Sequence, residues 1–189
     1  LVVMSAPNGP AFLASVVAVR RRGAIPVLAD AAAPEAERAR IAARVEAAAV
    51  FVCREPWPAG PAEWTARRGA ARPAVHDGAG FAKLTSGSSG EPSAILATSE
   101  ALAADDDALF RSMGLRDDDR FVAAIPFSHS YGLSSLVLPA LRRGSMLVLP
   151  EEGGPWAPLD AAREAGATVL PSACGACASF WSPRSTGCR

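Results

Sequence analysis

The sequence predicts an α/β protein in which strands and helices alternate along the chain and build a mainly parallel sheet. Short apolar runs rich in Val and Leu recur between longer segments that carry apolar side chains at helical spacing. Strand, helix and strand in succession are typical of βαβ units, whose strands lie parallel. The composition agrees, because 50% of the residues are hydrophobic and 20% are charged, as in a globular protein.

The first third of the chain contains three expected strands and two expected helices. In order, they are a strand at 1–4, a helix at 12–22, a strand at 24–28, a helix from 34 to about 46 and a strand at 49–53. Gly23 stands where a C-cap belongs, and Arg20 to Arg22 before it suit the negative end of a helix dipole. Pro34 followed by Glu35 and Glu37 is typical of a helix start.

Residues 54–80 interrupt the alternation and are expected to form an irregular connection, because prolines and glycines are spread along them. The alternation then resumes. The expected segments are a strand at 81–84, a helix from 99 to about 113, a strand at 120–125, a helix at 133–141, a strand at 146–149, a helix at 159–165 and a strand at 168–170. After Pro171 neither period appears, so we expect one domain over 1–171 and a tail over 172–189 that does not belong to it.

The charge balance argues against two classes of partner. There are 19 basic and 19 acidic residues, so no overall field favours nucleic acid or an anionic membrane. Among the basic residues only Lys83 is a lysine. No stretch is apolar for the roughly 20 residues that a membrane helix needs, and the apolar start lacks the basic segment of a signal peptide. We therefore expect a cytoplasmic protein.

The cysteines are expected to be thiols without a functional site. Cys174 and Cys177 have the spacing of a redox pair, and Cys188 would supply a third metal ligand. A redox pair, however, begins a helix in a thioredoxin-type unit, which the neighbouring sequence does not provide. A zinc site would need a fourth ligand, and both histidines are far away in the sequence. The fourth cysteine, Cys53, ends an expected strand, and we expect no metal site.

A stretch rich in hydroxyls and glycines follows the strand expected at 81–84. It consists of Thr85, Ser86, Gly87, Ser88, Ser89 and Gly90. Glycines let backbone N–H groups approach a phosphate closely, and hydroxyls add donors and can reach a metal ion. The alternative is a Gly/Ser-rich surface turn. We expect Leu84 to end the strand and residues 85–90 to form a loop at the carboxyl edge of the sheet, where ligands bind in open α/β sheets.

Two sharper motifs are excluded in this stretch. A Walker loop has lysine after its last glycine, whereas Gly90 is followed by Glu91 and Pro92. A nucleophile elbow needs a glycine two positions on each side of a serine, and neither Ser88 nor Ser89 has this.

Residues 84–92 closely resemble the phosphate-loop signature of the adenylate-forming superfamily, the AMP-forming acyl-CoA synthetases and their relatives. That signature is written Tyr/Leu-Thr-Ser-Gly-Ser/Thr-Thr-Gly-x-Pro-Lys-Gly. Residues 125–133 resemble the family's next signature, a strand ending in Pro-x-x-His-x-x-Gly. Residues 12–28 resemble its segment ending in Arg-x-Gly-Ala-x-x-Val-x-x-Asp, with Asp30 in register. The resemblance runs from residue 1 to about residue 171 and covers part of the large N-terminal domain.

The resemblance implies a ligase that joins an acid to a thiol. ATP and a small-molecule carboxylic acid would form an acyl-adenylate and pyrophosphate, and a thiol such as coenzyme A would then take the acyl group. Residues 85–90 would bind the β- and γ-phosphates together with Mg²⁺. Donors aimed at the leaving pyrophosphate stabilise the charge that develops on it, so the physical chemistry agrees. His129, Tyr131 and Gly132 would form a wall of the acyl site.

Two acidic runs are expected to be solvated charges and not metal ligands. Residues 105–107 are expected at a helix start, and residues 117–119 in a loop before a strand. Neither run is assigned a role in the reaction.

Three departures from the family pattern shape the expectation of activity. Ser93 replaces the loop lysine, and Ala94 stands where the pattern has glycine. The family's later signatures, including the C-terminal domain with its catalytic lysine, do not occur in these residues. Finally, residues 172–189 do not continue the family's apolar helix. We therefore expect a fragment that is inactive alone, and assign no catalytic residue.

Two alternatives stay open. One is a non-catalytic binding or scaffold module that retains the adenylation fold, which the serine at position 93 favours. The other is an unrelated α/β domain with a fortuitous Ser/Gly turn, which three ordered segments at family spacing disfavour.

Overall fold

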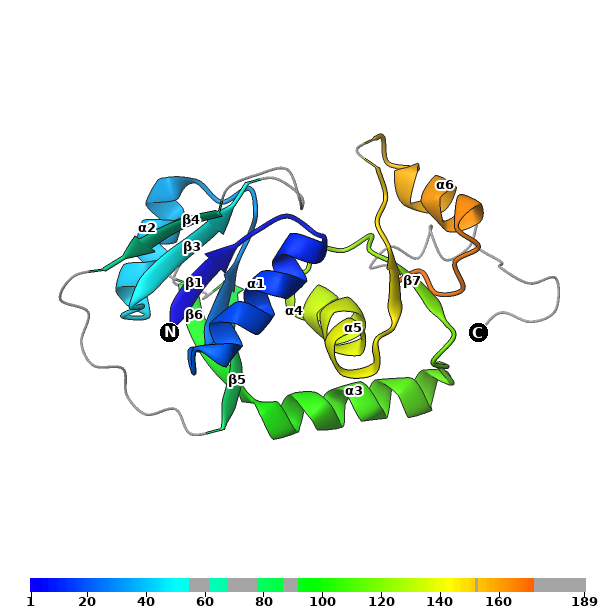
Figure 1. Ribbon diagram of the computed structural model, residues 1–189, viewed down its shortest axis with the longest axis horizontal. Helices are drawn as coiled ribbons and strands as arrows, with labels where there is room; N and C mark the ends of the chain where they lie inside the picture. Colours follow the sequence, from blue (N-terminus) through cyan, green and yellow to red (C-terminus); the bar gives the residue numbers. More distant parts are fainter. Residues whose placement is uncertain (55–61, 68–77, 87–91, 152, 172–189) are drawn as a thin grey trace. The chain divides into compact units, whose positions relative to one another are not determined.

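The computed structural model describes residues 1–54, 62–67, 78–86, 92–151 and 153–171. The chain divides into two compact units, Leu1–Leu102 and Ala103–Arg189. Figure 1 shows the elements of both, from the N-terminal strand in blue to the last described helix in orange. Each unit has its own sheet, and each is described separately below.

The first unit is a six-stranded sheet in the order β4-β3-β1-β2-β5-β6. Its elements are β1 (Val2–Ser5), α1 (Pro10–Arg21), β2 (Pro26–Ala29), α2 (Glu35–Arg44), β3 (Ala49–Cys53), β4 (Ala62–Ala66), β5 (Ala79–Ser86) and β6 (Pro92–Thr98). The four central strands are parallel, and the two outer strands are antiparallel to their neighbours. The predicted α/β class with a mainly parallel sheet is confirmed.

Helices α1 and α2 cover opposite faces of this sheet. Consecutive strand residues point to opposite faces, so neighbouring residues of β1 contact different helices. Val2 packs with Val19 of α1, whereas Val3 packs with Ile41 of α2. Every residue of β1 and β2 is buried, as expected for central strands of a sheet that is covered on both faces.

Two strands of the first unit were not predicted. β4 lies within the segment expected to be irregular, and it is exposed at every position, so it carries no apolar period. Pairing with β3 defines it, and Trp64 of β4 lies edge-on to Phe51 with ring centroids 6.2 Å apart. β6 follows the Ser/Gly-rich stretch and forms by antiparallel pairing with β5. Each of these strands is defined by antiparallel pairing with the preceding strand, so the pattern within its own residues did not reveal it.

Helix α3 (Ser99–Met113) begins in the first unit and ends in the second. The second unit then contains β7 (Arg120–Val122), α4 (Ser130–Gly132), the π-helical η1 (Leu133–Val137), α5 (Leu138–Arg143), β8 (Met146–Val148) and α6 (Ala157–Glu164). β7 and β8 pair in parallel. The strand predicted at 168–170 is reduced to one parallel bridge, between Phe121 and Val169.

The helix predicted at 133–141 is longer than expected and contains a π-turn. Elements α4, η1 and α5 follow one another without a break from residue 130 to residue 143. Pro139 has no N–H to bond the carbonyl four residues earlier, and the widened turn lies directly before it. Gly144 ends the helix in the left-handed conformation, with φ of 72°. Within the described ranges, no helix has the length and apolar character needed to cross a membrane.

Candidate functional site

The predicted phosphate-binding stretch begins inside a strand. β5 continues to Ser86, so Thr85 and Ser86 are strand residues and were wrongly expected in a loop. Thr85 pairs with Ser93 of β6, and Ser86 pairs with Pro92, so the hairpin ladder extends the strand beyond Leu84. Gly87, Ser88, Ser89 and Gly90 lie outside the described residues.

The strand end lies at the predicted edge of the sheet. β5 runs parallel to β2, and β2 runs parallel to β1 and, through it, to β3. Ser86 is therefore at the carboxyl edge, where open α/β sheets bind their ligands. Thr85 is partly exposed there.

The two faces of the β5–β6 hairpin have different surroundings. Ala82, Leu84 and Ala94 belong to the core cluster that includes Ile41 of α2. Alternation along a strand places positions 83 and 85 on the opposite face. Directly paired residues share a face, so positions 93 and 95 lie on the same face as 83 and 85.

A tight turn places His129 and Tyr131 at the start of the helix in the second unit. The His129 N–H donates to the carbonyl of Pro126 at 3.1 Å, and the Leu133 N–H donates to the His129 carbonyl at 2.8 Å. His129 Nδ1 accepts the Tyr131 N–H at 3.2 Å and so caps the helix. A neutral imidazole whose Nδ1 accepts carries its proton on Nε2, which is then a donor. Both side chains are exposed.

Gly132 explains the spacing of the second signature. A Cβ at this position would lie 2.1 Å from the Pro126 carbonyl oxygen and 2.9 Å from its carbon. Any side chain would collide with this backbone, so the turn closes only around glycine. Proline, histidine and glycine at this spacing therefore define one compact strand-to-helix turn.

The predicted site residues thus fall into two groups. His129, Tyr131 and Gly132 are brought together in one turn of the second unit. Thr85 and Ser86 belong to the first unit. In the described ranges, no cluster of three or more His, Cys, Asp or Glu residues suits a metal ion. Cys53 is a buried thiol, whereas Cys174, Cys177 and Cys188 lie outside the described residues.

The acidic run at 105–107 was expected at a helix start as solvated charges; Asp105 is exposed, but the expectation was wrong for the place of the run and for Asp106. The run lies in the middle of α3, and Asp106 is completely buried. Arg142 and Arg143, at the end of α5, both pair with Asp106, with Arg143 Nε 2.8 Å from Asp106 Oδ2. Arg142 Nη1 also lies 3.2 Å from Asp107 Oδ1. These partners are more than 30 residues apart in sequence, which is why no local pattern showed the cluster.

Arg143 and Asp107 complete this charged cluster between α3 and α5. The Arg143 guanidinium lies over the Phe110 ring, 4.0 Å from its centroid, and also pairs with Asp107. The hydrogen bond from Arg142 lowers the pKa of Asp107, and the nearby arginine charges add to this. The cluster has a structural role.

The second acidic run holds a loop. The Asp119 carboxylate accepts the Arg116 N–H at 2.7 Å and the Thr168 hydroxyl at 2.8 Å. Thr168 Oγ1 in turn accepts the Arg120 N–H at 2.9 Å, next to the bridge between Phe121 and Val169. Asp118 pairs with Arg116 and raises the pKa of that guanidinium. Asp118 and Asp119 therefore make hydrogen bonds and an ion pair that hold this loop, although their run was expected to be solvated.

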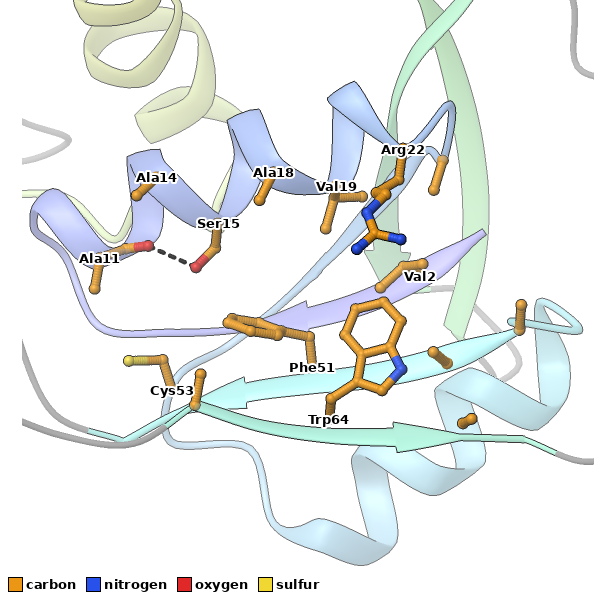
Figure 2. A pocket seen from close by; sticks show the side chains of 15 residues that line it. Val2, Ala11, Ala14, Ser15, Ala18, Val19, Arg22, Phe51, Cys53 and Trp64 are labelled. Carbon is orange, nitrogen blue, oxygen red and sulfur yellow. Dashed lines mark hydrogen bonds between the residues drawn. The ribbon is translucent and has the colours of Figure 1, made fainter.

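A large apolar hollow lies between α1 and the strands β1, β3 and β4, with a volume of about 870 Å³. Figure 2 shows the rings of Phe51 and Trp64 on its floor, beneath the small side chains of Ala14 and Ala18. The Arg22 guanidinium reaches over one end. No residue of β5 lines the hollow. It is therefore separate from the strand end that carries Thr85.

The described residues thus form an α/β protein in which Thr85 and Ser86 lie at the carboxyl edge of a mainly parallel sheet, the edge where open α/β sheets bind ligands. The model of the family "AMP-binding enzyme" matches residues 1–180. The chain belongs to this family, whose members are ligases and synthetases that form adenylates. A search of the curated proteins finds no match.

Several solved structures share the fold. O-succinylbenzoate coenzyme A synthetase (MenE) from Bacillus subtilis, in complex with AMP, superposes with a TM-score of 0.71 at 17% identity, covering 94% of this chain and 50% of that one. Mycobacterium smegmatis MbtA gives 0.67 at 20% identity, covering 89% and 37%. The amide bond synthetase McbA from Marinactinospora thermotolerans gives 0.66 at 25% identity, covering 89% and 38%. The chain spans half or less of the length of these proteins.

Proposed function

We propose that this chain carries the phosphate-binding segment and one acyl-site wall of an enzyme that activates a carboxylic acid with ATP. The reaction would give an acyl-adenylate and pyrophosphate, followed by transfer of the acyl group to a thiol such as coenzyme A. The observation that carries the proposal is the family match over residues 1–180, together with the position of Thr85 at the carboxyl edge of the sheet. Residues 1–171 would form part of the adenylation domain.

Residues 85–90 would hold the β- and γ-phosphates of ATP. They offer four hydroxyls and, at two glycines, backbone that a phosphate can approach closely. Hydroxyl oxygens also suit Mg²⁺, which would neutralise part of the phosphate charge when bound. Donors placed at this strand end would stabilise the negative charge that grows on pyrophosphate as it leaves.

His129 would orient the carboxylic acid. Its Nδ1 is occupied by the Tyr131 N–H, so Nε2 is the nitrogen that can donate. The same cap and the contact of Gly132 with Pro126 hold the ring at the start of the helix. A carboxylate oxygen hydrogen-bonded to Nε2–H would be held in place while its other oxygen attacks the α-phosphate. Positioning of this kind contributes several kcal/mol to catalysis.

Thiol transfer is the proposed second step. MenE is a coenzyme A synthetase, whereas McbA is an amide bond synthetase, so related folds serve different acceptors. We favour a thiol because the phosphate-loop residues resemble those of acyl-CoA synthetases. Release of coenzyme A thioester, and no amide, from a mixture of acid, ATP, coenzyme A and amine would support this choice.

The first experiment measures ATP binding to the chain. We expect weak, salt-sensitive binding, because the contacts to the triphosphate would be exposed. Thr85→Ala and Ser86→Ala should weaken binding further, whereas Ser112→Ala, which removes an exposed hydroxyl in α3, should not. Equal binding by all four proteins would refute the assignment of residues 85–90.

The second experiment measures carboxylate-dependent exchange of labelled pyrophosphate into ATP, with short, long and aromatic acids. We expect no exchange by this chain, because its residues include no assigned site for adenine or ribose. Exchange above a blank without enzyme, lost in Thr85→Ala and Ser86→Ala, would overturn the expected inactivity and would support the site.

A second candidate function is a non-catalytic binding module with the adenylation fold. Ser93 favours it, because a cation of the family pattern is missing from that position. ATP binding that is indifferent to Thr85→Ala, combined with no exchange in any longer form of the protein, would favour the module over the enzyme.

A further inference from the structure

The position of the chain's single lysine relative to Ser93 offers a further inference. The family pattern places a lysine where this chain has Ser93, which leaves the predicted phosphate segment without that cation. Of the 19 basic residues, only Lys83 is a lysine. It lies in β5, two residues before Thr85.

The hairpin register places Lys83 beside the position of the missing cation. Lys83 pairs with Ile95, and Thr85 pairs with Ser93. Positions 83 and 93 are therefore diagonal neighbours on the same face of the hairpin, at a typical spacing of about 7–8 Å that long side chains span. A cation carried at either position would serve the same patch of this face, next to Thr85.

The surroundings of Lys83 leave it available for an anion. The opposite face of the hairpin packs on the core, through Ala82 and Leu84. Lys83 is half-buried, and Ile95 beside it is 57% exposed, so this part of the face is open within the first unit. None of the ion pairs found among the described residues involves Lys83.

We propose that Lys83 supplies the phosphate-facing cation that Ser93 does not. This inference rests on the proposed function, since it assigns a further binding residue to the same triphosphate site. A lysine acts on phosphate as a point charge on a flexible side chain. The same phosphate can therefore be reached from either of two diagonally neighbouring backbone positions. Lys83 would therefore bind the triphosphate and leave the chemical step to other groups.

The single lysine makes a direct binding measurement possible. A chain labelled with ¹³C,¹⁵N-lysine has one lysine side-chain signal, which belongs to Lys83. Inorganic triphosphate, and then ATP with Mg²⁺, should shift this signal saturably, with an affinity that falls as salt is added. A side-chain signal that stays in place while the backbone amide signal of Lys83 responds to the same ligand would overturn the inference.

A double-mutant cycle tests whether a lysine at position 93 can replace Lys83 in binding triphosphate. Lys83→Met, which keeps an unbranched side chain and removes the charge, should weaken triphosphate binding about tenfold, the loss expected for one charge-assisted hydrogen bond. Ser93→Lys should restore most of this loss in the Lys83→Met background and should improve the unchanged chain much less. Additive effects of the two substitutions would show that the positions do not share one phosphate contact.

Controls separate the possible failures. Arg44→Met removes an exposed charge at the end of α2 and should leave binding unchanged. Lys83→Arg should retain most of the affinity, and thermal unfolding checks that each variant is folded. Binding by the unchanged chain that survives Lys83→Met refutes this inference alone. No binding of ATP or triphosphate by the unchanged chain refutes the proposed function together with it.

Discussion

Both units of this chain have a buried apolar core, and among the described residues the second unit also contains a buried charge cluster. In the first, β1 and β2 are buried along their whole length, and apolar clusters on both faces of the sheet join them to α1 and α2. In the second, the two paired strands have three residues each, and a buried carboxylate with two arginines joins α3 to α5. Apolar burial follows a period along the chain, but a charge cluster depends on partners that only the fold brings together.

The same contrast applies to the site residues. Thr85 and Ser86 are placed by the backbone ladder of a sheet, which depends little on their side chains. His129 and Tyr131 are placed by a turn that needs one glycine and one imidazole acceptor. We expect single substitutions near the second group to disturb its geometry more than substitutions near the first.

The largest expected effect is in the apolar core of the first unit. Phe12 is fully buried, so Phe12→Ala should destabilise this unit by about 3–5 kcal/mol, independently of salt. Native-state hydrogen exchange should show faster opening in residues 1–102. Val17→Ala, at a position 37% exposed on the same helix, is the matched control and should change little. A loss in Phe12→Ala no larger than that in Val17→Ala would contradict a packing role for the buried ring, since alanine raises helix propensity at both positions.

The next effect should appear in the second unit. Asp106→Ala removes a buried carboxylate that pairs with two arginines and should cost about 3 kcal/mol, because both guanidinium groups lose their buried partner and keep only the partly exposed Asp107. Exchange should speed up in α3 and α5, while the amides of β1 and β2 stay protected. Asp105→Ala, exposed on the same helix, is the control. Equal protection in both variants would contradict a role for the cluster in stability.

Gly132→Ala should cost about 1–3 kcal/mol, since a Cβ collides with the backbone of Pro126 and the turn must open. We expect the His129 ring signals to change, because the cap on the Tyr131 N–H is strained or lost. Gly154→Ala has open space around the new methyl group and serves as the control. Unchanged His129 signals in a destabilised Gly132→Ala protein would separate the turn from the cap.

The smallest effect concerns acid. The hydrogen bond from Arg142 lowers the pKa of Asp107 in the folded state, so its contribution to stability is present above the unfolded value of about 3.9. That contribution is lost as pH falls through the lower folded pKa. In Asp107→Asn, the free energy of unfolding of the second unit should therefore fall less steeply as the pH is lowered. An unchanged dependence of the unfolding free energy on acid pH would mean that other carboxylates dominate that dependence.

The sequence predicted the features that local chemistry encodes. Alternating periods of strand and helix and the glycine after α1 depend on residues within a few positions of one another. Each is a property of one strand or one helix and is encoded without reference to the rest of the fold.

Other features depend on partners that the chain meets only after folding. β4 exists because β3 pairs with it, and strand β5 includes Thr85 and Ser86 because β6 continues the ladder beside them. Asp106 is buried because arginines 36 and 37 residues later reach it. Strand registers and buried ion pairs join separate segments, and no pattern within one segment specifies its partner.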